Sequence, residues 1–161
     1  MAVLSTNEMM FQAFEPKVKN RFIMHMNDIP AFMVKKVSAP GFEDGVIKLD
    51  HINSYRKLRG KREWKDMSMT LYNPIAPAGS QAVMEWARTG YESLTGRAGY
   101  AADYKQDLTL NILGPIGDVI GEWVIKGAFI KDMAEGDYDW SSADAAEITM
   151  TVAMDYCVLN F

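Results

Sequence analysis

The sequence predicts a mainly β domain, an antiparallel β-barrel or sandwich with one flanking α-helix. Seven segments have the composition or the apolar–polar alternation of strands, whereas only one substantial segment has apolar residues at helical spacing. Turns rich in Gly and Pro separate most of these segments, so most strands can follow one another antiparallel. A length of 161 residues is that of one domain, and we treat 1–161 as a single domain.

The first 20 residues predict an N-terminal arm with a short helix. Ser5 and Glu8 have the spacing of a capping box, and Met9, Met10 and Phe14 lie on one side of a helix over 5–14. A helix of this length is not stable alone. It must therefore dock on the domain or on a neighbouring copy.

Four strands are predicted next. Segments 21–27 and 31–37 flank the turn "NDIP" and are expected to form a hairpin, and 45–52 is a third strand. Segment 53–63 contains five cations in seven residues around Gly60, which indicates a flexible loop or a long hairpin tip. Strand 64–72 alternates, with Met67, Met69 and Leu71 on one face and polar residues on the other.

The second half predicts the helix and the remaining strands. Segment 81–94 has helical spacing, 95–106 is expected to be a loop, and 107–113 is a strand. Segment 119–133 is one long strand or two strands joined at Gly127.

The last strand, 145–157, alternates strictly. Its apolar face carries Ile148, Met150, Val152, Met154 and Tyr156. The opposite face carries small, polar and acidic residues, so it can contact bulk solvent or form the wall of an enclosed space.

The composition excludes several functions. A net charge of −4 argues against a general nucleic-acid binder, no stretch is long and apolar enough for membrane insertion, and the start lacks the features of a secretion signal. The single cysteine fits a reducing compartment. The two histidines have no metal-spaced companion, and no nucleophile, phosphate-loop or dinucleotide motif is present. We therefore expect no enzyme activity, cofactor or metal.

The basic segment and the acidic segments predict contacts between copies. The basic candidates are Arg56, Lys57, Arg59, Lys61 and Arg62. The acidic candidates are Glu43, Asp44, Glu135, Asp137, Asp139 and Asp144. Opposite charges at a contact fix its orientation. The alternatives are a solvated loop tip and, less favoured in an acidic chain with few aromatics here, a nucleic-acid contact.

The order of landmarks from about residue 20 to the end resembles one family. The landmarks are "VSAPG" (37–41), "RGKREWKDMSMTLYN" (59–73), "VMEWA" (83–87), an acidic 138–148 and "TVAMDYC" (151–157). Together they resemble the tail tube proteins of contractile-tailed bacteriophages, which are related in fold to the inner tubes of type VI secretion and other contractile injection systems.

The resemblance implies hexameric rings that stack into a hollow tube. Its partners would be further copies of itself, the sheath, the baseplate, the tape-measure protein, the tail terminator, and double-stranded DNA that passes without specific binding. The protein would be located in the tail tube of the virion, which would be assembled in the host cytoplasm. The basic segment 53–63 would contact the next ring.

The resemblance also suggests a lining for the channel. The candidates are Asp66, Ser68, Thr70, Glu147, Thr149, Thr151 and Asp155. A negative wall repels phosphates, so DNA slides past it. Alternation alone leaves open whether this face is the lumen or the tube exterior. The tube of an injection system and, more distantly, a lipocalin-like ligand barrel are alternatives to the phage tube.

Overall fold

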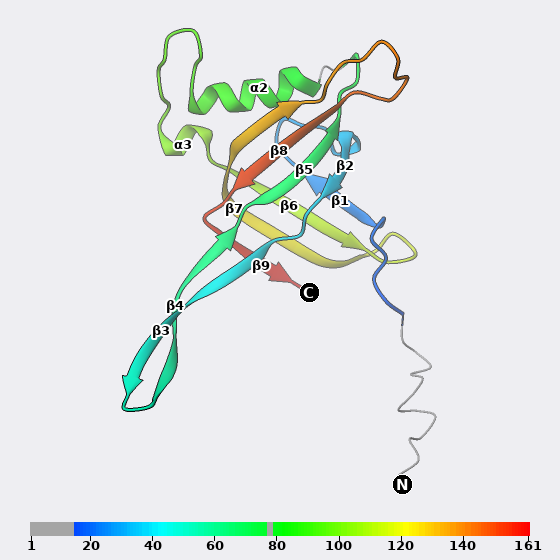
Figure 1. Ribbon diagram of the computed structural model, residues 1–161. Helices are drawn as coiled ribbons and strands as arrows, with labels where there is room; N and C mark the ends of the chain where they lie inside the picture. The colour runs from blue at the N-terminus through cyan, green and yellow to red at the C-terminus, as the bar shows by residue number, and fades with distance from the viewer. Residues whose placement is uncertain (1–14, 77–78) are drawn as a thin grey trace.

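A computed structural model describes residues 15–76 and 79–161; the predicted helix over 5–14 lies outside them. The described elements are β1 (Phe22–His25), the 3-10 turn η1 (Ala31–Met33), β2 (Val34–Val37), β3 (Gly41–His51), β4 (Ser54–Lys65), β5 (Met67–Tyr72), α2 (Gly79–Gly90), α3 (Ala101–Tyr104), β6 (Gln106–Leu113), β7 (Val119–Glu135), β8 (Glu147–Ala153) and β9 (Tyr156–Asn160). The mainly β, antiparallel class with one substantial helix is confirmed (Figure 1).

Two antiparallel layers share the long strand β7. The first half of β7 pairs with β6 and β9, and β1 pairs with β6. The second half pairs with β8, which continues through β5 to β2. The path therefore runs β1-β6-β7-β8-β5-β2, with β1 and β2 at its two ends.

The segment predicted as one long strand or two strands joined at Gly127 is one strand, β7, which bends at Gly127 (Figure 1). Gly127 has a φ of +65°, a backbone conformation that residues with a side chain rarely adopt. The bend lies between the two halves of β7 that pair with different neighbours. One glycine thus lets a single strand serve both layers.

The hairpin predicted over 21–37 does not form. Residues 31–33 are a 3-10 turn, and β1 pairs with β6 while β2 pairs with β5. Local sequence supports two strands and a turn, but the pairing is decided by long-range partners.

The strand predicted over 145–157 is interrupted. It ends at Ala153, and β9 begins at Tyr156 after a turn and pairs with the first half of β7. Ile148, Met150 and Val152 are buried as predicted, but Tyr156 is exposed and Cys157 is buried instead. The turn shifts the alternation by one residue, which is why the predicted faces fail after Val152.

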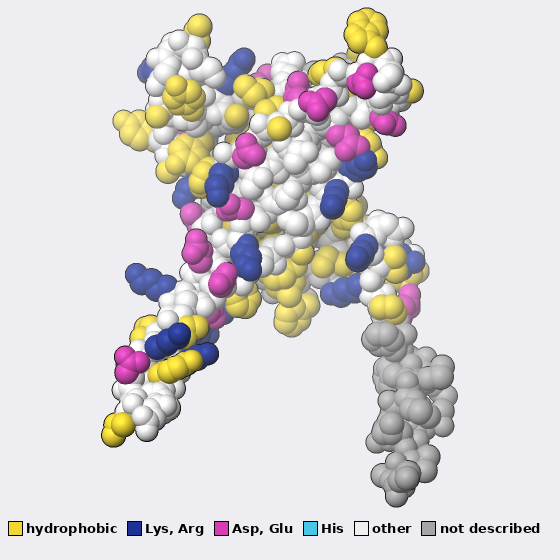
Figure 2. Space-filling model, in the orientation of Figure 1, with side chains coloured by type: hydrophobic (Ala, Val, Ile, Leu, Met, Phe, Trp, Pro, Cys, Tyr) yellow, Lys and Arg dark blue, Asp and Glu magenta, His cyan; other side chains and the backbone are white. Residues whose placement is uncertain are grey.

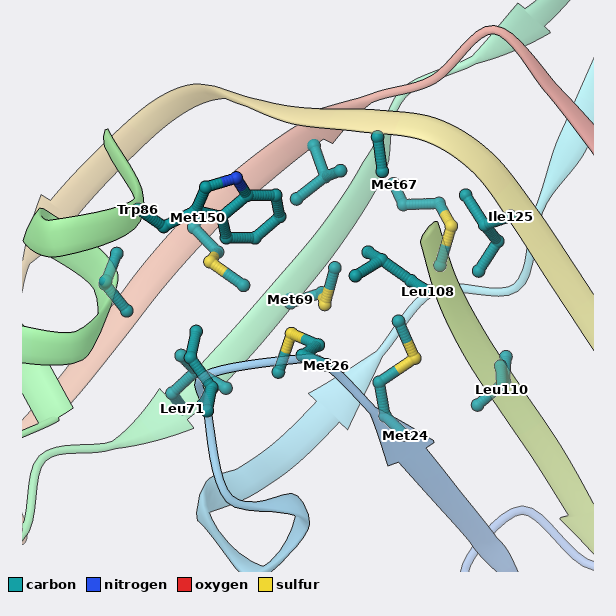
Figure 3. Close-up of a cluster of buried hydrophobic side chains, with 14 of the residues drawn as sticks. Met24, Met26, Met67, Met69, Leu71, Trp86, Leu108, Leu110, Ile125 and Met150 are labelled. Carbon is teal, nitrogen blue, oxygen red and sulfur yellow. The ribbon is translucent and has the colours of Figure 1, made fainter. Parts of the chain in front are cut away.

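Methionine-rich packing fills the space between the layers (Figure 3). Among the described residues, six methionines are buried there, namely Met24, Met26, Met33, Met67, Met69 and Met150. They contact Leu71, Leu108 and Ile125 within one cluster of buried side chains. Unbranched, pliable side chains suit this irregular gap between two sheets.

The helix α2 closes one end of this core. It begins two residues earlier and ends four residues earlier than predicted, and the segment after it contains the short helix α3. Val83 and Trp86 are buried, and the Trp86 indole donates a hydrogen bond to the Tyr104 carbonyl oxygen at 2.9 Å. Tyr104 also stacks edge-on against Phe129 of β7, with ring centroids 5.7 Å apart.

Candidate assembly surfaces

The hairpin of β3 and β4 projects from the two layers (Figure 1). Its strands pair with each other from Gly41–Lys65 out to His51–Ser54 as a separate two-stranded sheet. The predicted loop over 53–63 is therefore wrong in form, because this segment is almost entirely strand. The alternative of a long hairpin is correct, and the tip lies at residues 52–53.

One face of the hairpin is basic and aromatic. Asp44 accepts two hydrogen bonds from the Arg62 guanidinium, at 2.7 and 3.0 Å, and lies 3.0 Å from Arg59. The Arg62 contact holds the pKa of Asp44 below its ordinary value. Farther out, Lys48 and Lys57 are opposite each other across the strands, and both lie over the Tyr55 ring.

Two lysines directly opposite each other destabilise a strand pair. Asp44 forms ion pairs with both arginines near the base of the hairpin, whereas the ion pairs of the described residues include none for Lys48 or Lys57. Asp50, opposite Tyr55, lies on the same outer face, which keeps a net positive charge. The outer part of this face therefore favours an anionic partner. Figure 2 shows Lys and Arg side chains along the projecting hairpin.

The opposite face of the hairpin is apolar, and sequence reasoning missed it. Ile47 lies opposite Leu58, and Leu49 lies opposite Arg56. Ile47, Leu49 and Leu58 are 52%, 44% and 43% exposed. The available signal was the alternation of these aliphatic residues, which the high charge of 56–62 obscured.

The structure separates the predicted basic and acidic candidates. Lys57, Arg59 and Arg62 share the basic face, Arg56 lies on the apolar face, and Lys61 lies beside the bulge in the hairpin. The acidic candidates divide into Glu43 and Asp44 on the hairpin and Glu135, Asp137, Asp139 and Asp144 around the β7–β8 connection. Asp44 is already engaged within its own hairpin, so its carboxylate is shared by this chain's arginines.

Five of the predicted lining residues share one face of the sheet. Ser68 pairs with Thr151, Thr70 with Thr149, and Tyr72 with Glu147 across β5 and β8. Their neighbours along these strands, Met67, Met69, Leu71, Ile148, Met150 and Val152, point into the core.

The charges of this Ser/Thr face are balanced by lysines. Lys131 contacts Asp66 at 2.6 Å, and Lys35 contacts Glu147. These carboxylates raise the pKa of Lys131 and of Lys35. Lys36, opposite Thr70, and Asp132, opposite Thr151, add one further charge of each sign. The face is therefore polar and nearly neutral, whereas the sequence suggests a negative one.

Asp155 does not share this face. It lies in the turn between β8 and β9, where Lys105 donates to both of its carboxylate oxygens at 2.8 Å. Its backbone N–H donates to the Lys126 carbonyl oxygen at 3.0 Å. Asp155 therefore fixes the turn onto the bend of β7.

Other kinds of site have little support in the described part of the chain. Over residues 15–76 and 79–161, the structure shows no group of three or more His, Cys, Asp or Glu side chains placed to hold a metal ion. In the same residues, none of the helices has the length and apolar character needed to cross a membrane.

Comparison with known proteins identifies the fold. No protein-family model matches the sequence, and no curated protein matches it. A chain in the cryo-EM structure of the anti-feeding prophage cap, the AFP tube-terminating cap, is similar with a TM-score of 0.76 and 16% identity, over 98% of this chain and 99% of that chain.

Two further solved structures share the arrangement. A chain of the extended PVC sheath-tube complex, an extracellular contractile injection system, is similar with a TM-score of 0.72 and 17% identity, over 98% of this chain and 99% of that chain. Hcp1 from Flavobacterium johnsoniae is similar with a TM-score of 0.50 and 10% identity, over 87% of this chain and 94% of that chain. The chain therefore has the contractile tail tube fold that its sequence resembles.

Proposed function

We propose that this chain is a structural, non-catalytic tube subunit of a contractile apparatus, and that six copies form a ring whose hairpins contact the next ring. The observation that carries the proposal is the β3–β4 hairpin, which has an exposed apolar face and a net basic outer face, where Lys48 and Lys57 outnumber Asp50. An isolated two-stranded hairpin is only marginally stable in water. A neighbouring copy that covers Ile47, Leu49 and Leu58 would remove that apolar surface from water.

Ring formation has support in the edges of the two layers, where β1, β2 and β9 each have one partner strand within residues 15–76 and 79–161. β9 pairs with β7 on one side, and β1 and β2 end the strand path. An exposed strand edge offers unpaired backbone groups for sheet continuation from copy to copy. We propose that these edges join the copies of a ring.

The Ser/Thr face suits the wall of a channel. Short hydroxyl side chains at Ser68, Thr70, Thr149 and Thr151, beside Glu147 and Asp66 that are paired with lysines, offer little to retain a passing polymer. We propose that DNA or a tape-measure protein passes here without specific binding. A contracting sheath and a baseplate are the further proposed partners, in a virion or virion-like particle assembled in the host cytoplasm.

Two kinds of apparatus remain candidates. The sequence resemblance favours the tube of a phage tail. The AFP cap and the PVC complex, both similar over nearly the whole chain, favour an injection system, and the cap adds the possibility of a ring that ends a tube. A tube subunit forms long stacks, whereas a terminating subunit stops at one ring.

Charge reversal on the hairpin tests the stacking role. Lys48→Glu with Lys57→Glu replaces the basic outer face by an acidic one, and we expect rings that no longer stack in negative-stain electron micrographs. The control is Arg88→Glu with Arg97→Glu, which makes the same change in net charge at exposed positions of α2 and of the segment that follows it. Normal tubes from the hairpin variant would contradict the stacking role.

A further inference from the structure

A groove lies between the two ends of the strand path. Its walls come from the segment leading into β1 and from β2, and its floor includes Leu110 and Ile112 of β6. The volume is about 890 Å³, within the usual range for a binding pocket. The groove exists because β1 and β2 join different layers and leave a seam instead of forming the predicted hairpin.

The groove combines an apolar floor with a basic rim. Phe22, Val34 and Val37 add to the floor. The rim carries Lys17, Lys19, Arg21, Lys35 and Lys36. Among the described carboxylates, only Glu147 forms an ion pair with this rim, at Lys35. The seam therefore favours an occupant that is both acidic and apolar.

The β7–β8 connection over 135–144 has this chemistry. It contains four carboxylates and no Lys or Arg. Tyr138 is 74% exposed and Trp140 is 107% exposed, so both aromatic side chains lie in solvent. Figure 2 shows Asp and Glu side chains together with exposed hydrophobic ones on this projecting connection.

We propose that the acidic aromatic connection 135–144 of one copy docks in the groove between β1 and β2 of a second copy. This inference rests on the proposed self-assembly and gives it a second contact, distinct from the hairpin. Burial of large aromatic side chains supplies most of the binding energy at such contacts, and complementary charge orients them.

Two other occupants, the hairpin and the same chain's connection, fit the groove less well. The hairpin is a poor match, because residues 41–65 contain seven Lys or Arg and four Asp or Glu, and the rim is also basic. The same chain's 135–144 lies outside the groove lining and faces a separate hollow that shares only Lys35 and Tyr72 with the groove. A second copy supplies the acidic segment without rearranging either site.

Cross-linking between two differently marked copies tests the contact. In a Cys157→Ala background, one copy carries Ala143→Cys in the connection and the other carries Val18→Cys, which lines the groove and is 44% exposed. The copies are purified apart, mixed and treated with a short bismaleimide. We expect a strong mixed dimer that contacts within one chain cannot produce. Replacing Ala143→Cys by Leu94→Cys, at an exposed position after α2, should reduce that band at least tenfold.

A second experiment exchanges the charges of the two surfaces. Glu135→Lys with Asp137→Lys should reduce the mixed dimer at least tenfold, and Lys19→Glu with Arg21→Glu on the groove copy should restore it. Rings in electron micrographs without the mixed dimer overturn this inference and leave the tube function intact. A protein that forms neither rings nor mixed dimer overturns both.

Discussion

Gly127 is the residue on which the shared strand depends. A Cβ atom at this position would lie 2.1 Å from the Asp155 carboxylate, and its φ is +65°. Asp107 accepts a hydrogen bond from the Gly127 N–H at 3.3 Å, and Lys105 holds Asp155 in place. Asp107 of β6 and Asp155 of the β8–β9 turn thus hold the bend from two elements, and its positive φ favours glycine.

Gly127→Ala should therefore destabilise the fold. Backbone strain of this kind costs about 1–3 kcal/mol, and the clash with Asp155 adds to it. Gly96→Ala is the matched control, because Gly96 has a φ of +69° but its nearest atom to an added Cβ is 3.9 Å away. Urea unfolding should show a larger loss in the free energy of unfolding for Gly127→Ala than for Gly96→Ala. Equal losses would contradict a contribution from the close approach of Gly127 to Asp155.

Asp107 makes a small contribution to stability that depends on pH. The Lys126 ammonium donates to its carboxylate at 2.6 Å and keeps the pKa of Asp107 below its ordinary value. The unfolded chain then binds more protons than the folded one, so this contribution is present at neutral pH and is lost as pH falls through the folded pKa.

Asp107→Asn measures this contribution. Both partners are partly exposed, so we expect a loss below about 1 kcal/mol at pH 7 and a smaller difference from the wild type near pH 3. Urea unfolding at the two pH values is the measurement. A difference that grows on acidification would contradict the assigned sign.

Cys157 should behave as an inert thiol in the folded protein. It is 7% exposed, and burial raises its pKa to about 11. Because the thiolate is the reactive form, iodoacetamide labelling at pH 8 should be at least tenfold slower in the native state than in urea. Equal rates would show that β9 does not stay paired with β7.

At the scale of elements, Trp86 connects the helix to the sheets. Trp86→Ala would leave a cavity between α2 and the core and would free the Tyr104 carbonyl oxygen. We expect a loss of about 3–5 kcal/mol in the free energy of unfolding. Trp86→Phe should recover most of the packing but not the hydrogen bond. A loss below 1 kcal/mol for Trp86→Ala would contradict this role.

The elements also show what local sequence can predict. The positions of β5, β6 and the first part of β8 could be predicted from the sequence, because the alternation of apolar and polar residues in these strands reflects one buried face. The partner strands of β1 and β2 could not be predicted, because a plausible turn between 21–27 and 31–37 carries no information on long-range pairing. The turn at Asp155 was also hidden, since "TVAMDYC" continues to alternate through it.

At the scale of the whole molecule, the candidate surfaces could be predicted only in part from the sequence. The basic and acidic segments stand out in the sequence, but alternation does not show that Asp44 is neutralised by Arg59 and Arg62. The seam between β1 and β2 arises from topology and has no local signature. The predicted fold, in contrast, follows from many weak signals that agree.

Native mass spectrometry of the purified wild-type protein, across a range of concentrations, tests the assembly most directly. If open sheet edges join six copies, a species of six times 18.1 kDa should appear and should be accompanied by annular particles in electron micrographs. An 18.1 kDa monomer at every concentration, with no annular particles, would contradict the proposed tube subunit.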